Sequence, residues 1–190
     1  RKQPVRIDLE NSPVYYGRAD AKVAVVEFFN FDCVICREAS TVVASIIDRY
    51  PGRVRLHLLH YPADARCNRN VRVAGDALSC RASLIAIALQ KTEHYRAFVS
   101  SIVESRLPLS RQLVLDALAG VGMDTERLKG ITDERDAEKT LVMQIIEGEN
   151  AGIVETPSFV INGKALRAGL PPEWLLDALI RDEIRRVYGD

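Results

Sequence analysis

Residues 22–36 read KVAVVEFFNFDCVIC, and this stretch decides the fold. Residues 22–30 are mostly apolar and rich in β-branched and aromatic side chains, which is typical of a buried strand in a mixed or parallel sheet. The stretch ends in two cysteines, Cys33 and Cys36, that are separated by two residues. The sequence therefore predicts a buried strand that leads directly into a pair of cysteines.

A helix and a second strand follow the cysteines. Apolar residues recur at helical spacing over 34–50, and Pro51-Gly52 ends the pattern. Residues 53–60 then alternate between apolar and polar side chains, as a strand does. Asp32 stands where a side chain often caps a helix. We expect a right-handed β-α-β unit with both cysteines at the start of its helix.

The remaining chain divides into a helical block and a short C-terminal unit. Helical patterns cover most of 65–151, with candidate helices over 71–91, 92–105, 110–121, 124–130 and 132–150. Thr156-Pro157 then introduces SFVING, a strand that ends in an Asn-Gly turn, and residues 164–167 would return antiparallel. Pro171 and Pro172 open a last helix. The predicted order is β-α-β, a helical block, and β-β-α.

Composition limits the classes of function. The chain has 190 residues, 47% hydrophobic and 27% charged, which is ordinary for a soluble protein with one core. Lys plus Arg and Asp plus Glu both number 26, and such a balance argues against nucleic acid as the main partner. No stretch is apolar and long enough to span a bilayer. The chain begins at Arg1 rather than Met, so we expect a processed or trimmed form, and the sequence leaves open whether a signal, an anchor or a fused membrane domain was removed.

A Cys-x-x-Cys pair at a helix start suggests thiol–disulfide chemistry. The unpaired N–H groups and partial positive charge at a helix N-terminus stabilise a thiolate. Cys33 would be the exposed nucleophile, and Cys36, one turn into the helix, would be the resolving thiol. The alternative is half of a zinc site. That alternative needs a second close pair of ligands, which Cys67, Cys80 and the three histidines do not offer, so we expect no metal.

The segments VEFFNFDCVIC at 26–36 and ETPSFVING at 155–163 together resemble the thioredoxin superfamily, and within it the periplasmic DsbA-like proteins. The resemblance implies an α/β thioredoxin fold with a helical insertion between its β-α-β and β-β-α halves. Residues 1–64 and 152–190 would form the thioredoxin-like core. Residues 65–151 would form the inserted helical subdomain.

The resemblance also assigns roles to further residues. Thr156-Pro157 matches the family's cis-proline loop, which presents backbone for an extended substrate to pair with; the alternative is an ordinary trans proline before a strand. Glu27 lies six residues before Cys33 and matches a buried acid that relays protons to Cys36. The alternative for Glu27 is an exposed position on a strand edge.

The sequence departs from the family between the two cysteines. DsbA-type oxidases often carry Pro-His there, and the histidine helps to stabilise the thiolate. Here the residues are Val34 and Ile35, which are apolar and would contact substrate. We therefore expect a less oxidising potential than that of the strongest oxidases, and the direction of electron flow stays open.

Cys67 and Cys80 form the second candidate pair. The stretch 60–83 resembles a subgroup whose thioredoxin domains work with vitamin K epoxide reductase homologues. A Cys67–Cys80 bond would close a loop of about 15 residues and stabilise the fold by about 3 kcal/mol in the chain-entropy model. We favour a structural disulfide, and the alternative is a second redox pair.

These features predict an exported enzyme, periplasmic or otherwise extracytoplasmic, that forms disulfides in cysteine-containing substrate proteins. They leave open whether the full-length protein is anchored to a membrane. No diffusible cofactor is expected. The resemblance implies a membrane partner of the DsbB or vitamin K epoxide reductase type that reoxidises the protein. One alternative is a reductase or isomerase with a more reducing potential. Another is a thioredoxin-fold binding or chaperone module whose cysteine pair does no chemistry.

Overall fold

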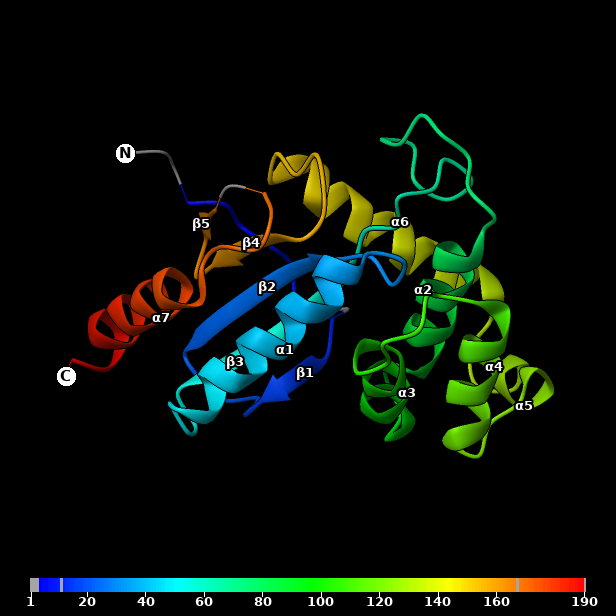
Figure 1. Cartoon of the computed structure of the whole chain (residues 1–190), viewed down its shortest axis with the longest axis horizontal. Helices are drawn as coiled ribbons and strands as arrows, with labels where there is room; N and C mark the ends of the chain where they lie inside the picture. The colour runs from blue at the N-terminus through cyan, green and yellow to red at the C-terminus, as the bar shows by residue number, and fades with distance from the viewer. Residues whose placement is uncertain (1–3, 11, 167, 190) are drawn as a thin grey trace.

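A five-stranded mixed sheet forms the centre of the computed structural model, which describes residues 4–10, 12–166 and 168–189. The sheet order is β1-β3-β2-β4-β5 (Figure 1). β2 is the middle strand, parallel to β3 and antiparallel to β4, which explains why its sequence is a nearly unbroken apolar run. The bounds are Val14–Gly17 for β1, Val23–Phe29 for β2, Val54–His60 for β3, Ser158–Ile161 for β4 and Lys164–Ala165 for β5.

Helices cover both faces of the sheet. α1 (Val34–Asp48) and α7 (Glu173–Tyr188) pack on one face, where Val25 and Phe29 of β2 meet the apolar sides of both helices. α6 (Glu134–Asn150) packs on the other face against Val26 and Phe28. The alternation of β2 side chains therefore supplies two separate cores, as expected for a strand that is buried on both sides.

The other helices gather at one end of the sheet, beyond the N-terminal end of α1 (Figure 1). They are α2 (Leu78–Leu89), α3 (His94–Val103), α4 (Arg111–Gly120) and α5 (Thr125–Lys129). With α6 they lie between β3 and β4 in the chain, so the predicted order of β-α-β, helices and β-β-α is confirmed. The boundaries of the predicted insertion at 65 and 151 stay a prediction. No helix within the described ranges is long and apolar enough to cross a bilayer.

Two predictions about element ends are wrong, and a third falls partly outside the described residues. The expected helix over 71–91 begins only at Leu78, because Ala77 adopts a left-handed conformation with φ of 68° and donates its N–H to the Asp64 carboxylate at 2.9 Å. The helix cap expected at Asp32 is Cys33 instead. The return strand expected over 164–167 is seen as β5, and position 167 lies outside the described residues.

Candidate active site

Cys33 caps the N-terminus of α1 with its own sulfur. The Cys33 Sγ accepts the N–H of Cys36 at 3.1 Å, in the way that a serine or aspartate oxygen usually caps a helix. Both thiols are free, with Cys33 partly exposed and Cys36 fully buried. A substrate can therefore reach the outer sulfur, whereas the inner sulfur is covered by the fold.

The two thiols differ strongly in acidity. The pKa of Cys33 is lowered to about 6, first by the hydrogen bond with the Cys36 thiol and then by N–H groups of the helix start, although partial burial acts in the opposite direction. Burial raises the pKa of Cys36 above its ordinary value, and the hydrogen bond to Cys33 adds to that rise. At neutral pH, Cys33 is therefore the thiolate and Cys36 the protonated thiol.

The loop that precedes β4 lies against Cys33. The Thr156–Pro157 peptide bond is cis. When Cys33 is protonated, its Sγ donates to the Thr156 carbonyl at 3.7 Å, and the Thr156 side chain lowers the pKa of both cysteines by hydrogen bonding. Sequence positions 33 and 156, far apart in the chain, therefore meet at one site.

The two residues between the cysteines face solvent. Val34 is 65% exposed and Ile35 is 54% exposed, although both are apolar. They lie beside the partly exposed Cys33 at the first turn of α1. The expected substrate contacts thus occupy accessible positions next to the outer sulfur.

Glu27 lies in the middle of β2 and is completely buried, so the alternative of an exposed strand edge is wrong. Its Oε2 accepts the hydroxyl of Ser40 from α1 at 2.8 Å, and its Oε1 has no hydrogen-bond partner among the residues that the structure describes. Burial raises the pKa of Glu27 well above its ordinary value, the Ser40 bond lowers it, and the Cys33 thiolate raises it. A buried acid with a raised pKa beside a thiol pair has the properties of a proton donor and acceptor.

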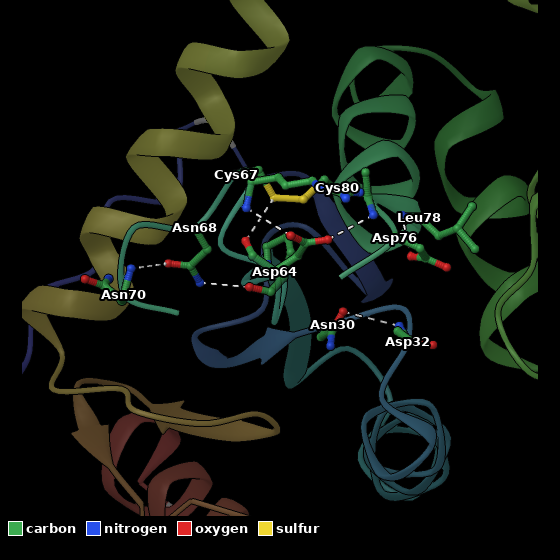
Figure 2. Close-up of a disulfide and its surroundings, with 12 residues drawn as sticks. Asn30, Asp32, Asp64, Cys67, Asn68, Asn70, Asp76, Leu78 and Cys80 are labelled. Atoms are coloured by element: carbon green, nitrogen blue, oxygen red, sulfur yellow. Dashed lines mark hydrogen bonds between the residues drawn. A yellow bond between two sulfur atoms is a disulfide. The ribbon is translucent and has the colours of Figure 1, made fainter. Parts of the chain in front are cut away.

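Cys67 and Cys80 are joined in a disulfide whose sulfurs lie 2.07 Å apart. The bond links the loop after β3 to the first turn of α2, and Figure 2 shows it directly above the Asp64 side chain. Asp64 accepts the N–H groups of Arg66 and Ala77, each at 2.9 Å, and these and other backbone donors lower its pKa. A carboxylate and a disulfide therefore hold the same loop.

Two buried side chains on α1 make contacts that were not predicted from the sequence. Ser40 binds Glu27, and Arg37 donates its Nη1 to the carbonyls of Ser105 and Leu107 at 3.1 and 2.7 Å. The available signal for Ser40 was its position one turn after Cys36, which puts both on one helix face. Across the described ranges, no group of three or more His, Cys, Asp or Glu side chains is arranged to hold a metal ion.

Comparison with solved structures places this fold among known redox proteins. A thioredoxin-like oxidoreductase from Silicibacter pomeroyi DSS-3 is 27% identical, with a TM-score of 0.75 over 93% of this chain and 94% of that one. A periplasmic thioredoxin-like protein from Salmonella enterica serovar Typhimurium is 18% identical, with a TM-score of 0.74 over 95% and 93% of the two chains. The thiol–disulfide exchange protein alpha-DsbA2 from Wolbachia pipientis is 19% identical, with a TM-score of 0.73 over 92% and 88%.

The two less similar structures share the fold with this chain, and the expectation of an α/β thioredoxin fold like that of DsbA-type proteins is confirmed. No curated protein sequence matches the chain. The family model described as Thioredoxin matches residues 9–180, which include both cysteine pairs, Glu27 and Thr156-Pro157. The chain therefore belongs to the thioredoxin family.

Proposed function

We propose that this protein is an exported thiol–disulfide oxidoreductase that forms disulfides in substrate proteins through Cys33 and Cys36. The observation that carries the proposal is the asymmetry of the pair: an accessible Cys33 with a pKa of about 6 above a buried Cys36 with a raised pKa. A structural disulfide or a metal clip needs no such difference between its two sulfurs. The asymmetry is what a nucleophile and a resolving thiol require.

In the forward reaction, a substrate thiolate attacks Cys33 of the oxidised pair. The Cys33–Cys36 bond breaks, a mixed disulfide forms between Cys33 and the substrate, and Cys36 leaves with the electron pair. Glu27 supplies the proton that Cys36 takes up. A second substrate thiolate then attacks the mixed disulfide, so that the substrate leaves oxidised and Cys33 leaves as a stable thiolate.

The low pKa of Cys33 favours this direction. A thiolate that is stable at neutral pH stabilises the reduced enzyme, and a stable reduced form makes the disulfide a better oxidant. The side chains of Val34 and Ile35 add no charge to stabilise the thiolate, so the hydrogen bonds from the Cys36 thiol and from the N–H groups at the helix start supply that stability. We therefore place the enzyme among oxidants, below the strongest of them.

Substrate would bind across the exposed start of α1 and the loop before β4. Thr156 and Pro157 would present backbone to an extended segment, which pairs with it as an added strand. Val34 and Ile35 would contact apolar side chains next to the substrate cysteine. The solved relative from Salmonella is described as periplasmic, which supports an exported location for this chain. A membrane oxidase of the DsbB or vitamin K epoxide reductase type would restore the Cys33–Cys36 disulfide.

The test is to mix the oxidised protein with a reduced peptide that contains two cysteines, and to follow both by mass spectrometry. We expect the peptide to become oxidised as Cys33 and Cys36 become alkylatable. The Cys36→Ser variant, loaded as a mixed disulfide between Cys33 and a small thiol, should exchange that thiol for a peptide that contains a single cysteine and accumulate as a protein–peptide adduct, because neither Cys36 nor a second peptide thiol is present to release it. The Cys33→Ser variant is the matched control and should form no adduct.

Two other results would overturn the proposal. If the reduced protein reduces the peptide disulfide and the oxidised protein leaves the dithiol unchanged, the enzyme is a reductase. If neither reaction occurs and Cys33 resists alkylation, the protein is a binding module. Either result overturns the proposal.

A further inference from the structure

The hydroxyl of Ser40 lies between two hydrogen-bond acceptors. Its Oγ is 2.8 Å from Oε2 of Glu27 and 3.0 Å from the carbonyl oxygen of Cys36. A hydroxyl has one proton to donate, so it can serve only one of these acceptors at a time. Ser40 and Glu27 are both buried, so bulk solvent does not reach this hydrogen bond.

The position of Ser40 on α1 brings Glu27 to the side of the helix that carries Cys36. Cys36 and Ser40 are one turn apart and share the buried face of the helix. Helical side chains point toward the N-terminus, so the Ser40 hydroxyl is directed toward Cys36. A carboxylate that binds this hydroxyl therefore lies on the side of α1 that carries Cys36.

We propose that Ser40 is a positioning residue that holds the Glu27 carboxylate on the side of α1 that carries Cys36 and moves its own hydroxyl proton between Glu27 and the Cys36 carbonyl as Glu27 changes protonation state. The inference deepens the proposed function and rests on the role of Glu27 in it. Ser40 does not touch substrate, so it acts only through Glu27.

Every proton has an acceptor in both states. When Glu27 is ionised, Ser40 donates to Oε2. When Glu27 carries a proton on Oε2, that proton can donate to the Ser40 oxygen, and the Ser40 hydroxyl turns to the Cys36 carbonyl. The buried carboxyl can thus gain and lose a proton without leaving this serine unsatisfied.

Few other groups act on Glu27. Its sheet neighbours are Leu58 on β3 and Phe159 on β4, which do not titrate. The Cys33 thiolate raises its pKa, and Tyr15 of β1 is coupled to it more weakly. Within the described part of the chain, no cation is paired with Glu27, so Ser40 is the hydrogen-bond donor that stabilises its charged form.

The relevant step is the attack of Cys36 on a mixed disulfide at Cys33. The Cys36–Cys33 bond forms, the bond from Cys33 to the bound thiol breaks, and that thiol leaves as a thiolate. The Cys36 proton passes to ionised Glu27. Ellman's reagent reports this step directly, since the reduced protein releases one coloured thiolate when Cys33 attacks and a second when Cys36 resolves.

The test measures the second phase by stopped flow between pH 5 and 9 in wild type, Ser40→Ala and Thr41→Val. Thr41 is the matched control, because its hydroxyl donates to the carbonyl four residues back, that of Arg37, and forms no hydrogen bond with a carboxylate of the described residues. We expect Ser40→Ala to move the pH midpoint of the second phase upward by about one unit, as loss of a hydrogen bond to a charged group predicts. Thr41→Val should leave the midpoint unchanged, and Ser40→Thr, which keeps the hydroxyl, should restore it.

A second readout is the titration of the Glu27 carboxyl carbon by NMR in protein labelled with ¹³C-glutamate, with Glu27→Gln to assign the signal. Ser40→Ala should shift this titration upward as well. A midpoint and a titration that both stay at their wild-type values overturn the role of Ser40. Absence of any exchange in the wild type counts against the proposed function, while the NMR titration still decides whether Ser40 acts on Glu27.

Discussion

The sulfur of Cys33 and the carbonyl oxygen of Thr156 lie 3.7 Å apart, although 123 positions separate the two residues in the chain. Cys33 comes from the start of α1, and Thr156 from the loop before β4. The pairing of β2 with β4 brings these segments together. The candidate site therefore forms only when the two halves of the thioredoxin core have joined across the helical insertion.

Alkylation of the reduced protein tests the acidity of Cys33. Because its pKa is lowered to about 6, the rate of reaction with iodoacetamide should rise between pH 5 and 7 and then level off. Peptide mapping should place the label on Cys33 and leave the buried Cys36 unlabelled. The Cys33→Ser variant should lose the fast reaction. A midpoint near 9, the ordinary value for a thiol, would contradict the helix-start geometry.

Removal of the second disulfide should destabilise the fold. Changing Cys67 and Cys80 together to Ser opens a loop whose ends are 13 positions apart, and the chain-entropy model predicts a loss of about 3 kcal/mol in the free energy of unfolding. Urea unfolding of the wild type and of the double variant, each with Cys33 and Cys36 reduced, measures this loss. If the bond is only structural, thiol exchange at Cys33 should continue at its wild-type rate under native conditions. A large drop in exchange with unchanged stability would instead indicate a redox role.

The sequence predicted the strand–helix–strand unit well because its signals are local. Alternating or continuous apolar residues mark β2, α1 and β3, and Pro51-Gly52 marks the end of the helix. The start of α2 was missed because it depends on a long-range contact, the bond from Ala77 to the Asp64 carboxylate. Local helix propensity over 71–77 could not reveal an acceptor 13 positions away.

Arg37 should contribute to stability through its two carbonyl contacts. Its buried guanidinium ties α1 to the segment between α3 and α4, where Ser105 and Leu107 accept its hydrogen bonds. Arg37→Met keeps the apolar stem and removes the donors, so we expect a loss of about 2 kcal/mol in the free energy of unfolding. The control is Arg49→Met, since Arg49 makes exposed ion pairs that are worth about 1 kcal/mol or less. Equal effects of the two changes would contradict this assignment.

His60 should make the protein sensitive to acid. Burial lowers the pKa of His60 to about 3, so the fold favours the neutral ring. This contribution to stability is complete above pH 6.5 and is lost as the pH falls toward 3. His60→Phe keeps the ring stacked on Phe31 and removes the titration. As the pH falls from 7 to 4, the melting temperature of the variant should therefore rise steadily relative to that of the wild type. A difference between the two melting temperatures that does not change with pH would show that His60 does not cause the acid sensitivity.

The sequence named the residues of the candidate site, but it indicated only some of the contacts between them. The two motifs identified Cys33, Cys36, Glu27 and Thr156-Pro157, because each has a distinctive residue type at a fixed spacing. The sequence pointed to Asp32 as the cap of α1, because a carboxylate is a common cap and a sulfur acceptor leaves no signal in the sequence. The structure has Cys33 as the cap instead. The bond between Ser40 and Glu27 joins a helix to a strand, and it becomes visible only when the two elements pack.

The equilibrium reduction potential of Cys33–Cys36 in glutathione buffers is the most direct measurement of the proposed chemistry. It is best made with Cys67 and Cys80 both changed to Ser, so that a single pair is titrated. The low pKa of Cys33 together with the uncharged Val34 and Ile35 predicts a potential that is lower than the value of about −120 mV of the strongest disulfide donors but no lower than about −180 mV. A potential of about −230 mV or lower would make the pair a reductant and would contradict the proposed direction of electron flow.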